Sequence, residues 1–205
     1  MINELLKRYP ILEECKKEIS LAEEILLNCF RNGNKLLVCG NGGSCADSDH
    51  IVGELMKGFL LKRKISEDMR AKLASFEDGE YLADNLQGAV PAISLTAHAG
   101  LISAFANDVS PDMVYAQQVF GYAKPGDVLI GITTSGNSAN VVNAAKVAKA
   151  CGMKVIGLTG KKENKLDKIS DVVIHAPETE TYKVQELHLP IYHYLCAKCE
   201  NEIFS

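Results

Sequence analysis

Five short apolar runs, separated by longer stretches of mixed character, limit the folds that this chain can adopt. The runs are rich in Val, Ile and Leu, and the first is continuously apolar over 36–39, so they predict strands that are buried on both faces. Such strands belong to a parallel sheet that helices cover on both sides. The predicted strands are residues 35–39, 90–95, 127–133, 154–160 and 171–177.

The intervals between these runs carry apolar residues at helical spacing. Strands that alternate with helices predict the α/β class, here a three-layer αβα sandwich around a five-stranded parallel sheet. With 205 residues, 47% of them hydrophobic, the chain suits one domain, residues 1–205. The predicted helices are residues 11–31, 44–59, 98–106, 111–122, 138–151, 162–169 and a last one from 182 to near the end.

Two segments are additional to this alternation. Residues 11–32 give an extra N-terminal helix with apolar residues on more than one face, which predicts packing in a helical bundle between subunits. Residues 60–89 are polar and predicted to be helical, and we interpret them as an insertion between the first two strands. A basic cluster adjoins this insertion, and we expect it to be a solvated face: Lys57, Lys62, Arg63 and Lys64.

The charge balance excludes some classes of function. The chain has 22 basic and 26 acidic residues and a net charge of −4, which argues against a general nucleic-acid binder. No apolar run is long enough to span a membrane, and residues 1–17 lack the apolar core of a secretory signal. We therefore expect a cytoplasmic protein that contacts neither nucleic acid nor membrane.

The seven cysteines are scattered, and their number is odd. Cys196 and Cys199 form one isolated CxxC pair within a predicted helix, which favours buried thiols over a zinc knuckle. Cys45 lies beside a glycine-rich turn, so a reactive thiol is the alternative interpretation there. The pattern as a whole predicts free cysteines in a reducing compartment.

Two glycine- and hydroxyl-rich turns carry the clearest functional signal. The turns "GNGGS" (40–44) and "TTSGNS" (133–138) each follow a predicted strand and begin a helix. Helix N-termini offer free N–H groups and partial positive charge, so the pair favours a phosphate site. Neither turn has the lysine of a P-loop or the spacing of a dinucleotide fingerprint. The candidate phosphate-binding residues are Asn41, Gly42, Gly43, Ser44, Thr133, Thr134, Ser135 and Ser138.

A histidine and a glutamate follow the first turn at helical spacing. His50 and Glu54 are four residues apart, so both project from one face of the helix over 44–59. Alone, such a pair is more often a helix-surface contact than a site. Its position after a phosphate-type turn gives it weight.

These motifs together resemble the sugar isomerase (SIS) domain. The residues that carry the likeness are "CGNGGS", His50, Glu54, "GDVLIGITTSGNSANV" (126–141) and "QELHLPIYH" (185–193), and the match is closest to the phosphoheptose isomerases. The resemblance implies a flavodoxin-like SIS fold and interconversion of sedoheptulose 7-phosphate with an aldose heptose 7-phosphate. It also implies a homotetramer with active sites between subunits, and zinc in some members.

The implied chemistry assigns roles to these residues. Aldose–ketose isomerisation proceeds through an enediol(ate) and needs a base at carbon and an acid at oxygen. Glu54 is the candidate base and His193 the candidate acid/base. Alternatively, His50, Glu54, Gln185 and His193 hold a zinc ion that polarises the carbonyl. The two schemes compete for Glu54. Asp108 matches an acid near the substrate in the family, and Gln185 is a candidate substrate ligand.

One spacing and two departures qualify the resemblance. Gln185 and His193 are roughly 12 Å apart along an ideal helix, so a shared metal requires a kink at Pro190 or ligands from different subunits. Gly58 replaces an arginine of the family and Tyr182 an aspartate, which leaves the identity of the sugar phosphate open.

A non-catalytic function is the alternative from another class. SIS domains also serve as phosphosugar sensors in regulators and as partners of a replication initiator. A pure binder does not need Glu54 together with His193, and both are present here. This combination favours the enzyme.

Overall fold

Five parallel strands form one sheet in the computed structural model, which describes residues 1–205. The sheet has the order β2-β1-β3-β4-β5 and confirms the predicted parallel α/β arrangement. The strands are β1 (Leu36–Gly40), β2 (Ala92–Ser94), β3 (Val128–Ile132), β4 (Lys154–Gly160) and β5 (Val172–Ala176). The chain moves outward from β1 in both directions, so the strand order reverses between β1 and β3. Ligands of open parallel sheets bind at such a point, beyond the carboxyl ends of the strands.

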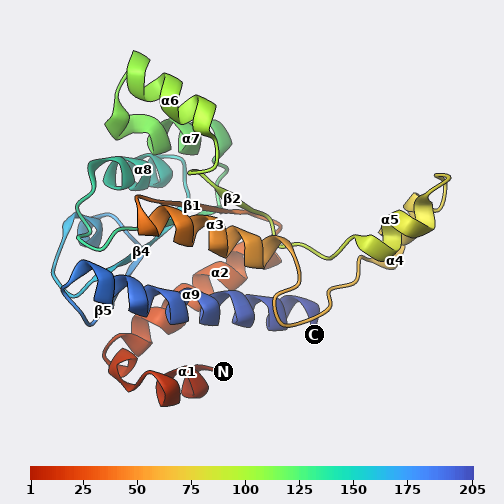
Figure 1. The fold of residues 1–205 in the computed structure, drawn as a ribbon, viewed down its shortest axis with the longest axis horizontal. Coiled ribbons are helices and arrows are strands. Elements are labelled where there is room, and N and C mark those ends of the chain that lie inside the picture. The colour runs from red at the N-terminus through yellow and green to blue at the C-terminus, as the bar shows by residue number, and fades with distance from the viewer.

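Alternate residues of the buried strands pack into two separate hydrophobic cores, one on each face of the sheet. Leu36 and Val38 of β1 pack in one cluster with α2 (Lys16–Arg31), α3 (Gly43–Met56) and α9 (Thr181–Phe204). Leu37 and Cys39 face the opposite cluster with α7 (Val114–Tyr122) and α8 (Ala139–Ala150). Figure 1 shows the two helical layers on either side of the sheet, with α6 (Ala99–Asp108) outermost. The three-layer sandwich is therefore as predicted.

The N-terminal helix is shorter than predicted. A separate helix α1 (Ile2–Arg8) precedes it, then the 3₁₀-helix η1 (Pro10–Cys15), and α2 begins only at Lys16. Pro10 forces this division, because proline lacks an N–H and disfavours a helical residue before it. The helix α2 packs against α9 and β5 of its own chain, so it belongs to this subunit's core. Its role in oligomerisation stays a prediction.

The predicted helix over 162–169 is wrong in kind. Only the 3₁₀-helix η3 (Lys165–Lys168) forms there. The Asn164 side chain caps it, and the Asp167 carboxylate accepts from the Asn164 N–H, so the element cannot start earlier. A second 3₁₀-helix, η2 (Pro111–Met113), precedes α7.

The insertion forms a projecting helical hairpin. Helices α4 (Glu67–Leu73) and α5 (Gly79–Asn85) pack on each other, and α4 buries none of its residues. We call residues 66–86 the arm; Figure 1 shows it extending away from the sheet. The arm carries six acidic and two basic side chains, an excess equal to the net charge of the whole chain. No helix of the protein is long and apolar enough to cross a membrane.

Candidate active site

A polar cavity lies at the carboxyl ends of β1 and β3. Its volume is about 310 Å³, and only Ile132 among its eleven lining residues is hydrophobic. We call it the anion cradle. It brings together every residue that the two turns predicted for phosphate binding and adds Gln185 and Thr181: Asn41, Gly42, Gly43, Ser44, Ile132, Thr133, Thr134, Ser135, Ser138, Thr181 and Gln185.

The backbone around this cradle keeps several donors free. The N–H groups of Gly42, Gly43, Thr134 and Ser135 make no hydrogen bond within the protein. Three helices also begin at the cradle: α3 after Gly42, α8 after Ser138 and α9 at Thr181. Their N-terminal ends add partial positive charge, so the cavity suits a phosphate dianion without any lysine or arginine.

Side-chain pairs hold the two turns at a fixed separation. Asn41 of the first turn exchanges two amide hydrogen bonds of 2.9 Å with Asn140 at the start of α8. The Tyr115 hydroxyl donates to the Gly40 carbonyl at 2.7 Å. In the second turn, the hydroxyls of Thr133 and Ser138 lie 2.9 Å apart. The cradle is thus preformed before any ligand arrives.

Gly42 and Gly43 are required for different reasons. Gly42 has φ = +58°, a conformation that disfavours side chains. At Gly43, a Cβ atom would lie 2.6 Å from the Gln185 Nε2 atom. The absence of that Cβ lets the Gln185 amide reach the first turn from α9. The residue that the sequence also proposed as a metal ligand therefore lies in the anion cradle.

Three ionisable side chains meet further along α3. The His50 Nε2 atom lies 3.2 Å from Glu54 Oε1 and 3.5 Å from His193 Nε2. We call His50, Glu54 and His193, which are candidates for catalysis, the catalytic cluster. The pair on α3 therefore faces the final helix α9, instead of being a simple surface contact. The structure unites both residues proposed for proton transfer.

The other nitrogen of His50 is held by Tyr192, which in turn pairs with Asp47. The Tyr192 hydroxyl donates to Asp47 at 3.1 Å, and its oxygen lies 3.1 Å from His50 Nδ1. Because that hydroxyl hydrogen is used by Asp47, Nδ1–H is the donor to Tyr192. The His50 ring is thereby oriented with Nε2 toward Glu54 and His193. Tyr192 and Asp47 were not identified from the sequence.

Electrostatics set the resting protonation of the cluster. Burial alone raises the pKa of Glu54, but the Lys57 ammonium at 2.7 Å and the His50 ring bring it below its usual value. Burial, with the neighbouring His50, lowers the pKa of His193. Near pH 7, Glu54 is a carboxylate and His193 a neutral imidazole. Lys57 is exposed, as expected, with 58% of its side chain accessible, and it also pairs with Glu54.

The proposed metal ligands are only partly assembled. His50, Glu54 and His193 lie together, whereas Gln185 faces the cradle. No three His, Cys, Asp or Glu side chains form a complete ligand set as they lie. Both histidines still direct an Nε2 atom toward the same place beside a carboxylate, which is a donor chemistry that suits zinc.

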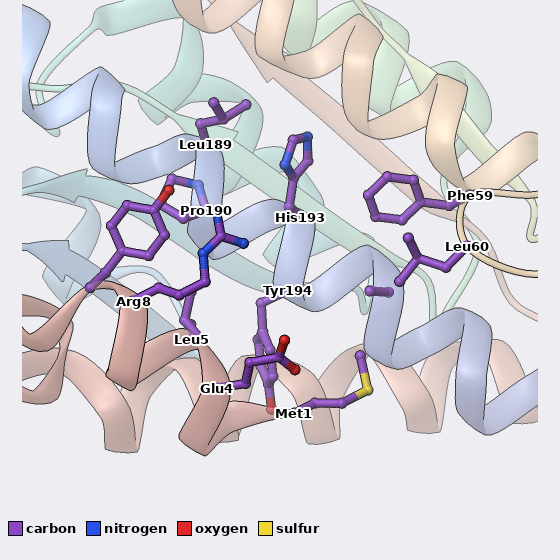
Figure 2. A pocket seen from close by; sticks show the side chains of 12 residues that line it. Met1, Glu4, Leu5, Arg8, Phe59, Leu60, Leu189, Pro190, His193 and Tyr194 are labelled. Atoms are coloured by element: carbon purple, nitrogen blue, oxygen red, sulfur yellow. The ribbon is translucent and has the colours of Figure 1, made fainter.

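A second cavity shares one wall with the catalytic cluster. Figure 2 shows it between α1 and α9, with His193, Phe59 and Leu60 on one side and Arg8 on the other. Its volume is about 250 Å³, and eight of its twelve lining residues are hydrophobic. Such a lining does not match a sugar phosphate, so the cradle is the better substrate site.

Two further predictions about side chains have different outcomes. Asp108 lies at the end of α6, where it accepts a hydrogen bond from the Asn107 amide and does not line the cradle. Its place near substrate stays a prediction. Arg63 was expected to be solvated, and this is wrong: the residue is 3% exposed and bonds Glu200. Thr181 was missed, although a hydroxyl at a helix start is a signal that could have identified it.

Comparison with known proteins shows which protein family this chain and its fold are similar to. The SIS domain signature matches residues 2–89 and again 86–160. A phosphoheptose isomerase of Aliarcobacter butzleri is 35% identical over 94% of this chain and 89% of its own length. One of Rhodospirillum rubrum is 34% identical over 95% and 90%. The solved structure of phosphoheptose isomerase GmhA from Neisseria gonorrhoeae superposes with a TM-score of 0.75, 31% identity, and coverage of 98% and 95%.

The class that fold and site define is therefore the SIS domain. The chain belongs to the phosphoheptose isomerase family of SIS-domain proteins. It is a phosphosugar isomerase, as the sequence resemblance predicted.

Proposed function

We propose that the protein interconverts sedoheptulose 7-phosphate and D-glycero-D-manno-heptose 7-phosphate through an enediol(ate). His50 and Glu54 lie further along α3, the helix whose first residues line the anion cradle, and there they meet His193 of α9. This juxtaposition is the observation that carries the proposal. A cradle alone would suit any phosphosugar-binding protein. The adjacent carboxylate and imidazoles add the groups that proton transfer requires.

The cradle binds the 7-phosphate and thereby determines which carbons of the substrate lie at the catalytic cluster. The free N–H groups of Gly42, Gly43, Thr134 and Ser135 and the surrounding hydroxyls face this cavity. On a helix that rises about 1.5 Å per residue, His50 lies about 10 Å along α3 from Gly43. An extended seven-carbon sugar phosphate covers a similar distance. Its C1 and C2 atoms then reach the catalytic cluster.

Glu54 transfers the proton between the two carbons. As a carboxylate it removes a proton from C1 of the ketose while the C2 oxygen receives one, which gives the enediol. The proton then returns to C2, and the O1 hydroxyl loses its proton to form the aldehyde. His193, a neutral imidazole beside His50, relays the proton between the two oxygens. Lys57 steadies the Glu54 carboxylate.

As the alternative role of the same side chains, we propose that the cluster holds zinc, in which case Glu54 is a ligand and a weaker base. His50, Glu54 and His193 would be ligands, with Gln185 the fourth from the sequence resemblance. The donor spacings of 3.2 and 3.5 Å support this, because zinc bonds of 2.0–2.1 Å put neighbouring tetrahedral ligands about 3.4 Å apart. The Tyr192–Asp47 pair supplies the outer hydrogen bond that metal-binding histidines usually have. Bound zinc would supply a Lewis acid that polarises the substrate carbonyl.

We further propose that the protein is a homo-oligomer, a tetramer with active sites between subunits. The support is that His193 forms a wall of the mostly apolar cavity between α1 and α9. A subunit seated over this cavity would complete the surroundings of the catalytic cluster. Sedimentation velocity at micromolar concentration measures the assembly directly, and a monomer would contradict this part of the proposal.

The deciding experiment follows sedoheptulose 7-phosphate by proton NMR in D₂O. We expect an aldose signal and deuterium at C1 with the native protein, and loss of both by at least 10³-fold in Glu54→Gln. The matched control is Asp49→Asn on the same helix, whose carboxylate accepts from Thr96 instead. A chelator, followed by added zinc, tests the metal. A folded native protein that gives no turnover and no exchange would refute the proposal and favour a phosphosugar sensor.

A further inference from the structure

Arg63 is a buried arginine at the root of the arm. Its guanidinium donates to two carbonyl groups near the end of α3, to Leu55 O at 2.6 Å and to Glu54 O at 3.0 Å. Both carbonyls belong to the last turn of α3, where no helical N–H group follows to pair with them, and a cation satisfies such groups well. The Leu55 carbonyl also accepts from the Val90 N–H at 2.9 Å. The Arg63 carbonyl in turn accepts from Gly88 N–H at 3.0 Å, where the chain returns from the arm. Through these hydrogen bonds, Arg63 holds the backbone of the last turn of α3, which includes Glu54.

Glu200 of α9 completes the arrangement. Its carboxylate, which has no exposed surface, accepts from Arg63 Nε at 2.7 Å. It also accepts three backbone N–H groups, those of Phe59 at 2.8 Å, Leu60 at 2.7 Å and Leu61 at 3.1 Å. Four donors surround this buried carboxylate, so its oxygens are fully satisfied.

The two catalytic side chains both depend on this pair. Arg63 holds the carbonyl of Glu54, while Glu200 holds Phe59, whose ring lies 5.5 Å from the His193 ring. Figure 2 shows Phe59 and Leu60 beside His193. We propose that Arg63 and Glu200 are positioning residues for the isomerase reaction, which set Glu54 and His193 relative to each other. This inference rests on the proposed function.

A purely structural role is the competing explanation, and the molecule offers a matched control for it. Lys35 and Asp127 form another ion pair, in which Asp127 is buried at 1% exposure and the Lys35 side chain is 20% exposed. Asp127 also accepts backbone N–H groups, from Lys35 at 3.0 Å and Lys124 at 2.8 Å. This pair lies before β1 and β3, at the end of the sheet remote from the catalytic cluster. The two pairs share their chemistry and differ in location.

The test compares Arg63→Lys with Asp127→Asn, both assayed with zinc at a temperature where circular dichroism shows full folding. Lysine keeps the charge but cannot reach Glu54 O, Leu55 O and Glu200 together. We expect kcat for sedoheptulose 7-phosphate to fall tenfold to 100-fold in Arg63→Lys, with KM within threefold of the native value. Asp127→Asn should keep the native kcat. Equal kcat losses in the two variants would overturn the proposal, and so would a native kcat in Arg63→Lys.

A second readout separates this proposal from the proposed function. The ring-proton NMR signals of His50 and His193 report the geometry of the cluster without any turnover. They should shift in Arg63→Lys and in Glu200→Gln, and stay unchanged in Asp127→Asn. If the native protein has no isomerase activity, the proposed function is refuted. The NMR shifts of the variants still test whether Arg63 and Glu200 position the cluster. Unmoved signals in both folded variants would refute the positioning, even in an active enzyme. If Arg63→Lys does not fold, Glu200→Gln provides both measurements.

Discussion

The polar groups at the two ends of the sheet differ in whether they have hydrogen-bond partners within the protein. At the amino end, Asp127 and Asp171 each precede a strand and are surrounded by donors. Asp171 accepts from Lys149 at 2.8 Å, Lys154 at 2.9 Å and the Val155 N–H at 2.8 Å. At the carboxyl end, the N–H groups of Gly42, Gly43, Thr134 and Ser135 have no protein acceptor. One end pairs its carboxylates with donors of the protein, and the other presents N–H donors that the protein itself does not pair.

This difference separates residues that stabilise the fold from residues that serve a ligand. Backbone donors that point into a polar cavity are satisfied by water or by a bound group, so the protein gains little stability from them. A buried carboxylate with every lone pair occupied contributes to stability and is costly to disrupt. Substitutions at the two ends should therefore change different measurements.

The largest effect is expected at the amino end, on stability. Asp127→Asn removes the charge that Lys35 faces and replaces an acceptor by an amide donor. We expect the free energy of unfolding to fall by about 3 kcal/mol. Urea unfolding at pH 7 measures it. KM for the phosphosugar should stay within twofold, and a tenfold rise would show that the two ends are coupled after all.

The next effect is expected at the carboxyl end, on binding. Gly43→Ala puts a methyl group where Gln185 Nε2 now lies, and this flexible amide must move within the cradle. We expect KM to rise about tenfold, with a change in unfolding free energy below about 1 kcal/mol. Steady-state kinetics and urea unfolding measure the two quantities.

Gly53→Ala on the same helix is the control for this substitution. Open space surrounds that position, so the added methyl group should leave KM unchanged. An equal rise in KM in both variants would show that the cradle responds to the helix rather than to the Gln185 contact.

A pH-dependent effect sharpens the comparison, because it comes from a buried group near the carboxyl end. His188 is fully buried and lies 3.1 Å from the Thr159 carbonyl, and burial lowers its pKa to about 4. The unfolded chain binds a proton near pH 6.5, and the folded protein does so only near pH 4. Stability is thus complete above pH 6.5 and falls as the pH drops toward 4. The slope approaches about 1.4 kcal/mol per pH unit.

His188→Gln tests this dependence, since glutamine keeps a donor for Thr159 and does not titrate. Urea unfolding at several pH values between 4.5 and 7 should give a flatter profile in the variant. Parallel profiles would mean that other groups cause the loss. KM at pH 7 should not change.

The smallest effect is expected from the arm. Replacing residues 66–86 by a short glycine–serine linker removes helices that pack mainly on each other, while Arg63 and Gly88 remain. We expect the melting temperature to change by less than about 2 °C, because loop length has a weak effect on stability. Differential scanning calorimetry measures it, and a drop of 10 °C would show that the arm belongs to the core.

The sheet and the cradle were predictable from sequence because their signals are local. A buried strand needs an apolar run, and an anion turn needs glycines and hydroxyls within five residues, as at 40–44. Even the division at Pro10 has a local cause that a stricter analysis of proline would have found.

Arg63 could not be predicted because its partner is distant. Glu200 lies 137 residues away, and nothing in the basic sequence around Arg63 distinguishes a buried guanidinium from a solvated one. The contact between Tyr192 and Asp47 spans 145 residues and was missed for the same reason. Long-range polar pairs depend on how the layers pack, which a single sequence does not encode in any short window.

The cysteines provide labels for the two ends of the sheet. Five of the seven thiols are buried, and burial raises their pKa values well above the ordinary one: Cys15, Cys29, Cys39, Cys196 and Cys199. The two accessible thiols are Cys45, beside the first glycine turn, and Cys151, which precedes β4. A maleimide fluorophore should therefore attach at only these two positions. With Cys151 replaced by serine, the remaining dye on Cys45 would report occupancy of the cradle by its emission, without any engineered cysteine.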